Sequence, residues 1–243
     1  SSIKKYIHEN LDLYLNESFT LLKVASVSSQ ESHKNDMYEC AGLFADYLKK
    51  AGTDIAEVYE TDGHPVVYAE KLIKDADFTI LVYGHYDVQP VDPIELWKSD
   101  PFEPEIRDGA IYARGANDDK GQTFMHLKAF QYLVKNEMLK CNVKFLIEGE
   151  EEIGSPSLAK WVEKNKGMLS CDMILVSDTT MLGENVPSIN CGMRGLAYIE
   201  LKVTGPDRDL HSGHYGGAIA NPLNELCKII ASLTDDKGRI NVP

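Results

Sequence analysis

Apolar side chains recur at every third or fourth position along two early stretches of the chain, residues 3–24 and 35–51. This spacing predicts amphipathic helices, and Gly52 lies where a glycine commonly ends a helix. Further helices are expected in segments that end near residues 137 and 166, and over residues 220–233.

Short apolar runs without that period predict strands, over residues 54–60, 65–71, 78–83, 110–113, 143–147 and 173–176. The runs 78–83, 143–147 and 173–176 are typical of strands that are buried on both faces of a parallel sheet. Residues 196–203 alternate between apolar and polar side chains, which indicates a half-exposed antiparallel strand.

This order of elements predicts an α/β fold with a mostly parallel sheet flanked by helices, followed by the start of a smaller α+β domain. We place the two domains at residues 1–194 and 195–243. About fifty residues are too few for a comfortable independent core. We therefore expect the second domain to be incomplete and the chain to be a fragment of a longer protein.

Composition and charge narrow the class of protein. With 43% hydrophobic and 26% charged residues, the 243-residue chain is expected to fold around a sizeable core. The formal net charge of −13 would repel phosphate, so no nucleic-acid or anionic-membrane partner is expected. No apolar run approaches the ~20 residues of a membrane span. Five scattered cysteines without a C-x-x-C pair favour reduced thiols and a cytoplasmic protein.

Acidic or histidine residues follow several of the predicted strands. This group comprises His85, Asp87, Asp118, the glutamates 150–152 and Asp178. Because the carboxyl ends of parallel strands meet at one edge of a sheet, a shared site is the economical explanation. One histidine with three or more carboxylates suits a hydrolytic site for one or two Zn²⁺ ions, with Mn²⁺ as a competitor. Adjacent glutamates would supply both a ligand and a base that is not a ligand.

Each of these residues also has an ordinary structural explanation. The acidic run 148–152 resembles a solvated surface, Asp118 and Asp119 would suit a helix cap, and Asp178 would suit a turn. His64 is assigned no role, and His126 is read as a packed or surface histidine. The residues alone therefore predict a metal-assisted hydrolase, and they leave the role of each glutamate open.

Six segments in succession carry a resemblance to a known family. They are Gly84-His85-Tyr86-Asp87-Val88-Gln89-Pro90, Trp97-x-x-x-Pro101-Phe102, Arg107-Asp108-Gly109, Arg114-Gly115-x-x-Asp118-Asp119-Lys120-Gly121, Glu148-Gly149-x-Glu151-Glu152-x-Gly154-Ser155 and Ser177-Asp178. From about residue 64 onward the chain resembles the co-catalytic zinc peptidases, which include carnosinases, carboxypeptidase G, aminoacylase and succinyl-diaminopimelate desuccinylase. These segments most resemble those of the carnosinase-like dipeptidases. The resemblance implies a zinc-exopeptidase-like fold.

The resemblance implies a set of metal ligands. His85 and Asp178 would bind one zinc ion, Asp118 would bridge two ions, and Glu152 would bind the second. The peptide bond after Asp118 would be cis. Family members carry a further histidine ligand far toward the C-terminus, whereas no histidine follows His214 here, and His214 itself is given no role. This departure also favours a fragment.

The resemblance also implies the residues that act on the substrate. Glu151 would be the general base, Asp87 would orient the imidazole of His85, and Glu150 would be a bystander, with an ambiguity of one residue in that register. His211, in the lid and dimerisation domain, would reach the partner's substrate in a homodimer and help to stabilise the oxyanion.

We therefore expect a di-zinc metallopeptidase of the dipeptidase type. The first alternative is an N-acyl amino-acid amidohydrolase that uses the same residues. The second is a non-catalytic metal-binding or dimerisation module derived from the fold, against which the presence of both Asp87 and Glu151 argues, because a binding module has no need for a base.

Overall fold

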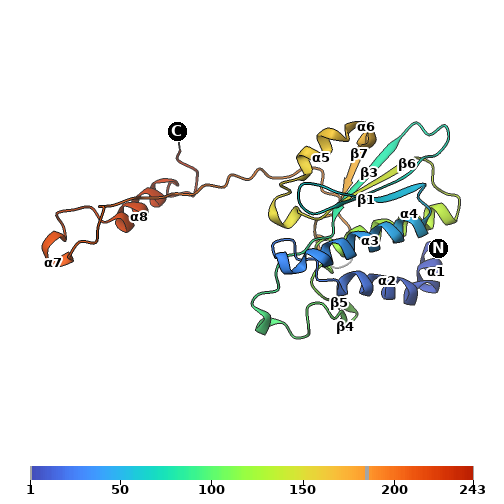
Figure 1. Cartoon of the computed structure of the whole chain (residues 1–243), viewed down its shortest axis with the longest axis horizontal. Coiled ribbons are helices and arrows are strands. Elements are labelled where there is room, and N and C mark those ends of the chain that lie inside the picture. Colours follow the sequence, from blue (N-terminus) through green and yellow to red (C-terminus); the bar gives the residue numbers. More distant parts are fainter. Residues whose placement is uncertain (1, 184–185, 243) are drawn as a thin grey trace. The chain divides into compact units, whose positions relative to one another are not determined.

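The computed structural model describes residues 2–183 and 186–242. The chain divides into two compact units, residues 1–186 and 187–243, which are coloured blue to orange and orange to red in Figure 1. The expected domain boundary at residue 194 stays a prediction. None of the helices in the described residues is both long and apolar enough to cross a membrane.

Two helices replace the single one expected over residues 3–24. α1 (Ser2–Glu9) ends before Asn10, and α2 (Leu11–Lys23) begins after it. The Asn10 side chain donates a hydrogen bond to the carbonyl oxygen of Tyr6 at 2.8 Å, which satisfies one of the acceptors left free at the end of α1. α3 (Lys34–Ala51) matches its prediction and ends at Gly52, whose φ of +105° is the left-handed conformation expected there.

The central sheet has five strands in the order β1-β2-β6-β3-β7. They are β1 (Ile55–Tyr59), β2 (Val66–Lys71), β3 (Thr79–His85), β6 (Asn142–Glu148) and β7 (Met173–Val176). β1 and β2 pair antiparallel, as do β2 and β6, whereas β3 pairs parallel with both β6 and β7. Only β2 therefore runs against the other strands of this mixed sheet. The carboxyl ends of β6, β3 and β7 lie side by side, as the sequence predicted.

Helices cover both faces of the sheet (Figure 1). On one face α3 and α4 (Lys120–Lys135) form a core with alternate strand residues such as Phe145 and Ile147. On the other, α5 (Leu158–Lys164) and α6 (Lys166–Leu169) pack on the intervening residues, including Leu146. This alternation along β6 is the expected consequence of the two-residue period of a strand.

Two sequence expectations about strands need correction. β7 forms where it was predicted, but its four residues are 37–60% exposed rather than buried. It lies at the edge of the sheet and pairs with β3 alone among the described strands. The strand expected over residues 110–113 forms as β5 (Ala110–Tyr112), but it pairs in a separate short hairpin with β4 (Glu105–Arg107), which the sequence did not predict.

The second unit contains α7 (Ser212–Tyr215) and α8 (Pro222–Ser232). Asn221 caps α8 by accepting a hydrogen bond from the Leu223 N–H at 2.9 Å. The strand predicted over residues 196–203 is not formed, and that segment has no regular structure. Alternation along a sequence indicates which side chains share a face, but a strand also needs a neighbour that accepts its backbone hydrogen bonds.

Candidate metal centre

His85 is the last residue of β3, and its imidazole is fully buried at the carboxyl edge of the sheet. The Nδ1 atom lies 3.1 Å from the backbone oxygen of Asp87 and 3.4 Å from its Oδ1 atom. The Nε2 atom faces carboxylates from separate segments of the chain. They are Asp118 (Oδ1 at 3.1 Å), Asp178 (Oδ2 at 3.7 Å) and Glu151 (Oε2 at 4.0 Å).

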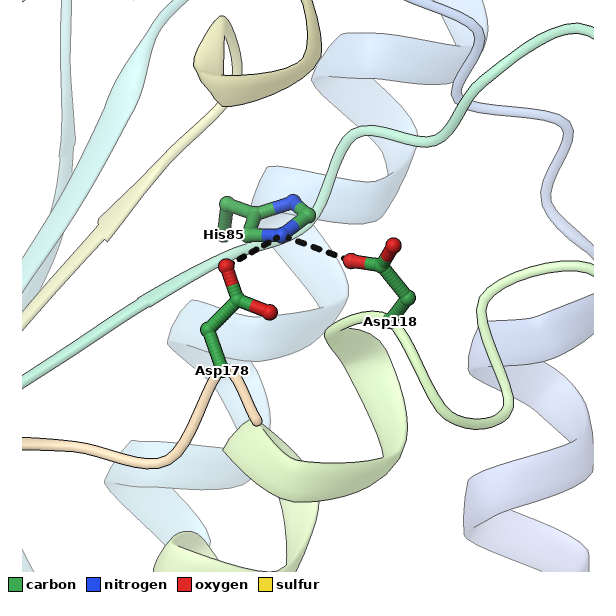
Figure 2. A group of neighbouring side chains, drawn as sticks. All are labelled: His85, Asp118 and Asp178. Carbon is green, nitrogen blue, oxygen red and sulfur yellow. Dashed lines mark hydrogen bonds and ion pairs between the residues drawn. The ribbon is translucent and has the colours of Figure 1, made fainter. Parts of the chain in front are cut away.

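His85, Asp118 and Asp178 each offer a donor atom, and these atoms lie within 4.8 Å of one another. Figure 2 shows the two carboxylates converging on the imidazole, Asp118 from the loop before α4 and Asp178 from the loop after β7. The peptide bond between Asp118 and Asp119 is cis, as the resemblance implied. One nitrogen and two carboxylate oxygens at this spacing fit a divalent ion of the zinc type.

The Asp87 carboxylate is buried behind this group and accepts three hydrogen bonds. The Ser28 hydroxyl donates to Oδ2 at 2.6 Å, and the backbone N–H of Glu152 donates to the same oxygen at 3.0 Å. The backbone N–H of Glu151 donates to Oδ1 at 3.2 Å. Asp87 therefore holds the turn that carries the two glutamates as well as lying beside the His85 ring.

The consecutive glutamates 150–152 have different environments. Glu150 is 5% exposed, and its carboxylate accepts hydrogen bonds from the backbone of His64 and from Ser157. Glu151 and Glu152 are half-buried, and burial raises the pKa of both carboxyl groups. Glu152 accepts a hydrogen bond from Gln89 at 2.8 Å and lies outside the group formed by His85, Asp118 and Asp178.

The charges around His85 change its protonation. Burial alone would lower the pKa of the imidazole, but the hydrogen bond and negative charge of Asp87, with further carboxylates, raise it to about 10. Burial raises the pKa of Asp119 to about 6. The neighbouring carboxylates thus favour a proton on the imidazole when no metal is bound, and a divalent ion would displace that proton while the imidazole stays as a ligand.

Asp119 is a site residue that the sequence left as a possible helix cap. Its side chain makes no capping bond; instead, its Oδ2 atom accepts hydrogen bonds from the His85 backbone N–H at 3.1 Å and from the Thr123 hydroxyl at 2.8 Å. Sequence reasoning also missed Ser28 and Gln89. Gln89 lies inside a quoted segment, whereas Ser28 precedes Asp87 by 59 residues and has no local signal.

Two further histidines, His126 and His211, lie outside the group formed by His85, Asp118 and Asp178. His126 is half-buried on α4, and its Nε2 atom lies 2.6 Å from the hydroxyl of Ser177, the residue before Asp178. His211 lies in the second unit at the start of α7, where its Nδ1 atom accepts a hydrogen bond from the Gly213 N–H at 3.0 Å. The roles implied for His211 and for the other site residues stay predictions.

Comparison with known proteins gives a consistent match. The model of "Peptidase family M20/M25/M40" matches residues 81–236. The human Beta-Ala-His dipeptidase is 34% identical over 98% of this chain and 50% of its own length. The Cys-Gly metallodipeptidase DUG1 of Candida albicans is 34% identical over 91% of this chain and 49% of its own.

A solved structure agrees with these matches. The M20 family metallo-carboxypeptidase Sso-CP2 of Sulfolobus solfataricus superposes with a TM-score of 0.75 at 36% identity, covering 93% of this chain and 51% of that one. The chain thus spans about half the length of the relatives that it matches.

Proposed function

The chain belongs to peptidase family M20/M25/M40, and from this premise we propose that it carries the catalytic residues of a metal-dependent dipeptidase. The observation that supports this most is the buried imidazole of His85, which faces carboxylates from three separate segments at one edge of the sheet. A structural ion pair has no need of so many carboxylates around one cation, whereas a hydrolytic metal centre does.

We assign the ligands as the resemblance implies. His85 and Asp178 would hold one ion, Asp118 would contribute to both, and Glu152 would hold the second, with Zn²⁺ as the proposed metal and Mn²⁺ as the alternative. The donor atoms of the first three residues lie within 4.8 Å of one another, which fits this assignment. When bound, the ions would polarise the scissile carbonyl and lower the pKa of a water molecule.

The protein's own residues carry the proton in this proposal. Glu151 accepts a proton from the attacking water as the C–O bond forms, and it returns that proton to the amine as the C–N bond breaks. Burial raises the pKa of Glu151 toward the range that suits a base near neutral pH. Asp87 keeps the His85 ring and the Glu151 backbone in place through the contacts described above.

A cavity of about 300 Å³ lies beside two of the proposed ligands, Asp118 and Asp178, and is lined also by Arg114, Asn117 and Thr180. It offers space for a small substrate next to the metal. The relatives named for Beta-Ala-His and Cys-Gly dipeptides favour dipeptides, with N-acyl amino acids as the alternative. We further propose a cytoplasmic homodimer in which His211 of the lid domain, residues 195–243, contacts the partner's substrate.

The test is Glu151→Gln, with Glu163→Gln on the exposed surface of α5 as the control. Metal content and dipeptide hydrolysis are measured on this chain and on a chain extended past residue 243. We expect Glu151→Gln to keep its metal and lose at least 10³-fold in turnover, because the amide cannot accept the proton. A Glu151→Gln protein as active as the unchanged one, or a protein that binds no divalent metal in either length, would overturn the proposal.

A further inference from the structure

Four polar residues connect the turn that carries Glu151 and Glu152 to the rest of the first unit. We call them the positioning ring: Ser28, His64, Asp87 and Glu150. Three of them received no role in hydrolysis from the sequence. The ring matters because the turn bears both the proposed base and a proposed ligand.

One half of the positioning ring runs through Asp87. Its buried carboxylate accepts the Ser28 hydroxyl hydrogen at 2.6 Å and the two backbone N–H groups of the turn at 3.0 and 3.2 Å. With three donors on two oxygens, the carboxylate has a single orientation that satisfies all of them. The orientation of Asp87 thus depends on Ser28, 59 residues earlier in the chain.

The other half runs through His64. Its Nε2–H donates to the backbone oxygen of Ser28 at 2.9 Å, and its backbone N–H donates to the Glu150 carboxylate at 3.0 Å. Glu150 is joined covalently to Glu151, so the path returns to the turn from which it began. The side chains of Ser28, Asp87 and Glu150 are at most 7% exposed. Hydrogen bonds so shielded from water are costly to leave unmade.

The backbone at Gly63 confirms how closely these segments approach. A Cβ atom there would lie 1.8 Å from the Glu150 Oε1 atom and 2.8 Å from the Ser157 hydroxyl oxygen. A side chain at residue 63 would therefore have to displace the Glu150 carboxylate from its hydrogen bonds with His64 and Ser157. The close contact is what lets the His64 backbone reach Glu150.

We propose that the positioning ring fixes the backbone of the Glu151–Glu152 turn before metal or substrate arrives, which makes Ser28 and His64 positioning residues. The inference rests on the proposed function, since it concerns the proposed base and ligand. Neither Ser28 nor His64 touches the reacting atoms. They act through Asp87 and Glu150, so their loss should leave the residues of the centre present but misplaced.

The first experiment measures amide hydrogen exchange of Glu151 and Glu152 by NMR in the metal-free chain. His64→Gln keeps a donor close to the Nε2 position, whereas His64→Leu removes it. We expect His64→Leu to speed exchange of both amides at least tenfold and His64→Gln to stay within threefold of the unchanged protein. His64 is only half-buried, so both variants should fold.

The second experiment compares Ser28→Ala with Ser26→Ala. Both serines are buried in one loop, and the Ser26 hydroxyl donates to the backbone oxygen of Tyr86 at 2.7 Å rather than to a carboxylate. We expect Ser28→Ala, but not Ser26→Ala, to speed exchange at Glu151 and Glu152. In the hydrolysing enzyme, Ser28→Ala should lower kcat about tenfold or more with KM little changed.

Unchanged exchange at Glu151 and Glu152 in both His64→Leu and Ser28→Ala would overturn the inference, as would equal effects of Ser28→Ala and Ser26→Ala. Where Ser28→Ala fails to fold, the His64 pair decides. Exchange is measured without metal or substrate, so a chain with the expected exchange pattern and no peptidase activity would contradict the proposed function alone.

Discussion

The two sides of the candidate centre hold their carboxylates in different ways. On the side of β3 and β6, Asp87 and Glu150 are buried, and hydrogen-bond donors of the protein occupy their oxygens. On the other side, formed by the loops before α4 and after β7 (Figure 2), the side chains of Asp118 and Asp178 are 60% and 32% exposed. Within the described residues their ion pairs are with His85.

This difference separates two kinds of carboxylate. An oxygen that already accepts amide hydrogens has little capacity left for a metal ion, so the buried side acts as a scaffold. An exposed carboxylate beside a histidine keeps its lone pairs, so the other side is suited to binding a metal. Changes on the exposed side should therefore affect activity, and changes on the buried side should affect stability as well.

The largest effect is expected for Asp118→Asn. The neutral amide removes the proposed bridging ligand, and activity should fall at least 10³-fold, or about 4 kcal/mol of transition-state stabilisation. The free energy of unfolding in the metal-free state should change by less than about 0.5 kcal/mol, because the side chain is exposed. Hydrolysis assays and urea titrations measure the two quantities. If Asp118→Asn greatly destabilised the metal-free protein, the exposed carboxylates would also be structural, and the proposed difference between the two sides would be wrong.

The opposite pattern is expected for Asp87→Ala. It leaves the Ser28 hydroxyl and two backbone N–H groups buried without their acceptor, at a cost of about 3 kcal/mol in the free energy of unfolding. The measurement is urea unfolding of the metal-free chain, with Asp118→Asn as the control. If Asp87→Ala lowered the free energy of unfolding by less than Asp118→Asn does, the buried hydrogen bonds of Asp87 would not be what stabilises this side of the centre.

Addition of metal should stabilise the chain through the exposed side. At a free Zn²⁺ concentration of 100 times Kd, the gain is about 2.7 kcal/mol. Thermal unfolding with and without a chelator measures it. The gain should disappear in Asp178→Asn, whose oxygen lies 3.7 Å from the His85 Nε2 atom, and persist in Ser26→Ala. Equal stabilisation of Asp178→Asn would place the ion elsewhere.

The smallest effect concerns His126, the half-buried histidine beneath the exposed side. Burial lowers the pKa of its imidazole, so the folded state binds fewer protons than the unfolded state. Its contribution to stability is therefore present above the unfolded pKa of about 6.5 and is lost as the pH falls through the lower folded value.

His126→Gln should remove this loss of stability in acid. The slope of the unfolding free energy against pH should change by less than about 1.4 kcal/mol per pH unit below pH ~6.5 and stay unchanged above pH ~7.5. Urea unfolding at pH 7.5 and 5.5 gives the comparison, with the exposed His8→Gln as the control. A steeper loss of stability in acid for His126→Gln than for the unchanged protein would contradict the burial of a neutral imidazole.

Much of the fold was predictable from local patterns. α3 ends at Gly52 as expected because helical spacing and a left-handed glycine are both properties of a few consecutive residues. β3 and β6 were predictable as strands because each is a short apolar run without helical period, although the equally apolar β7 proved to be exposed. The convergence of His85 and Asp178 followed from one further rule, that parallel strands end at the same edge of a sheet. Asp118 follows the separate β4–β5 hairpin and joins them through the loop before α4 (Figure 2), which that rule does not predict.

Other features depended on which segments meet. The sequence alone determined most of the helices and strands and which segments carry metal-binding side chains, since these features depend on a few neighbouring residues. The tertiary structure decided that β7 is an exposed edge, that residues 196–203 pair with no strand in the described part of the chain, and that His64 and Ser28 are linked by hydrogen bonds to Asp87. Such contacts join residues that are dozens of positions apart, and their distances arise only when the whole sheet and its loops are assembled.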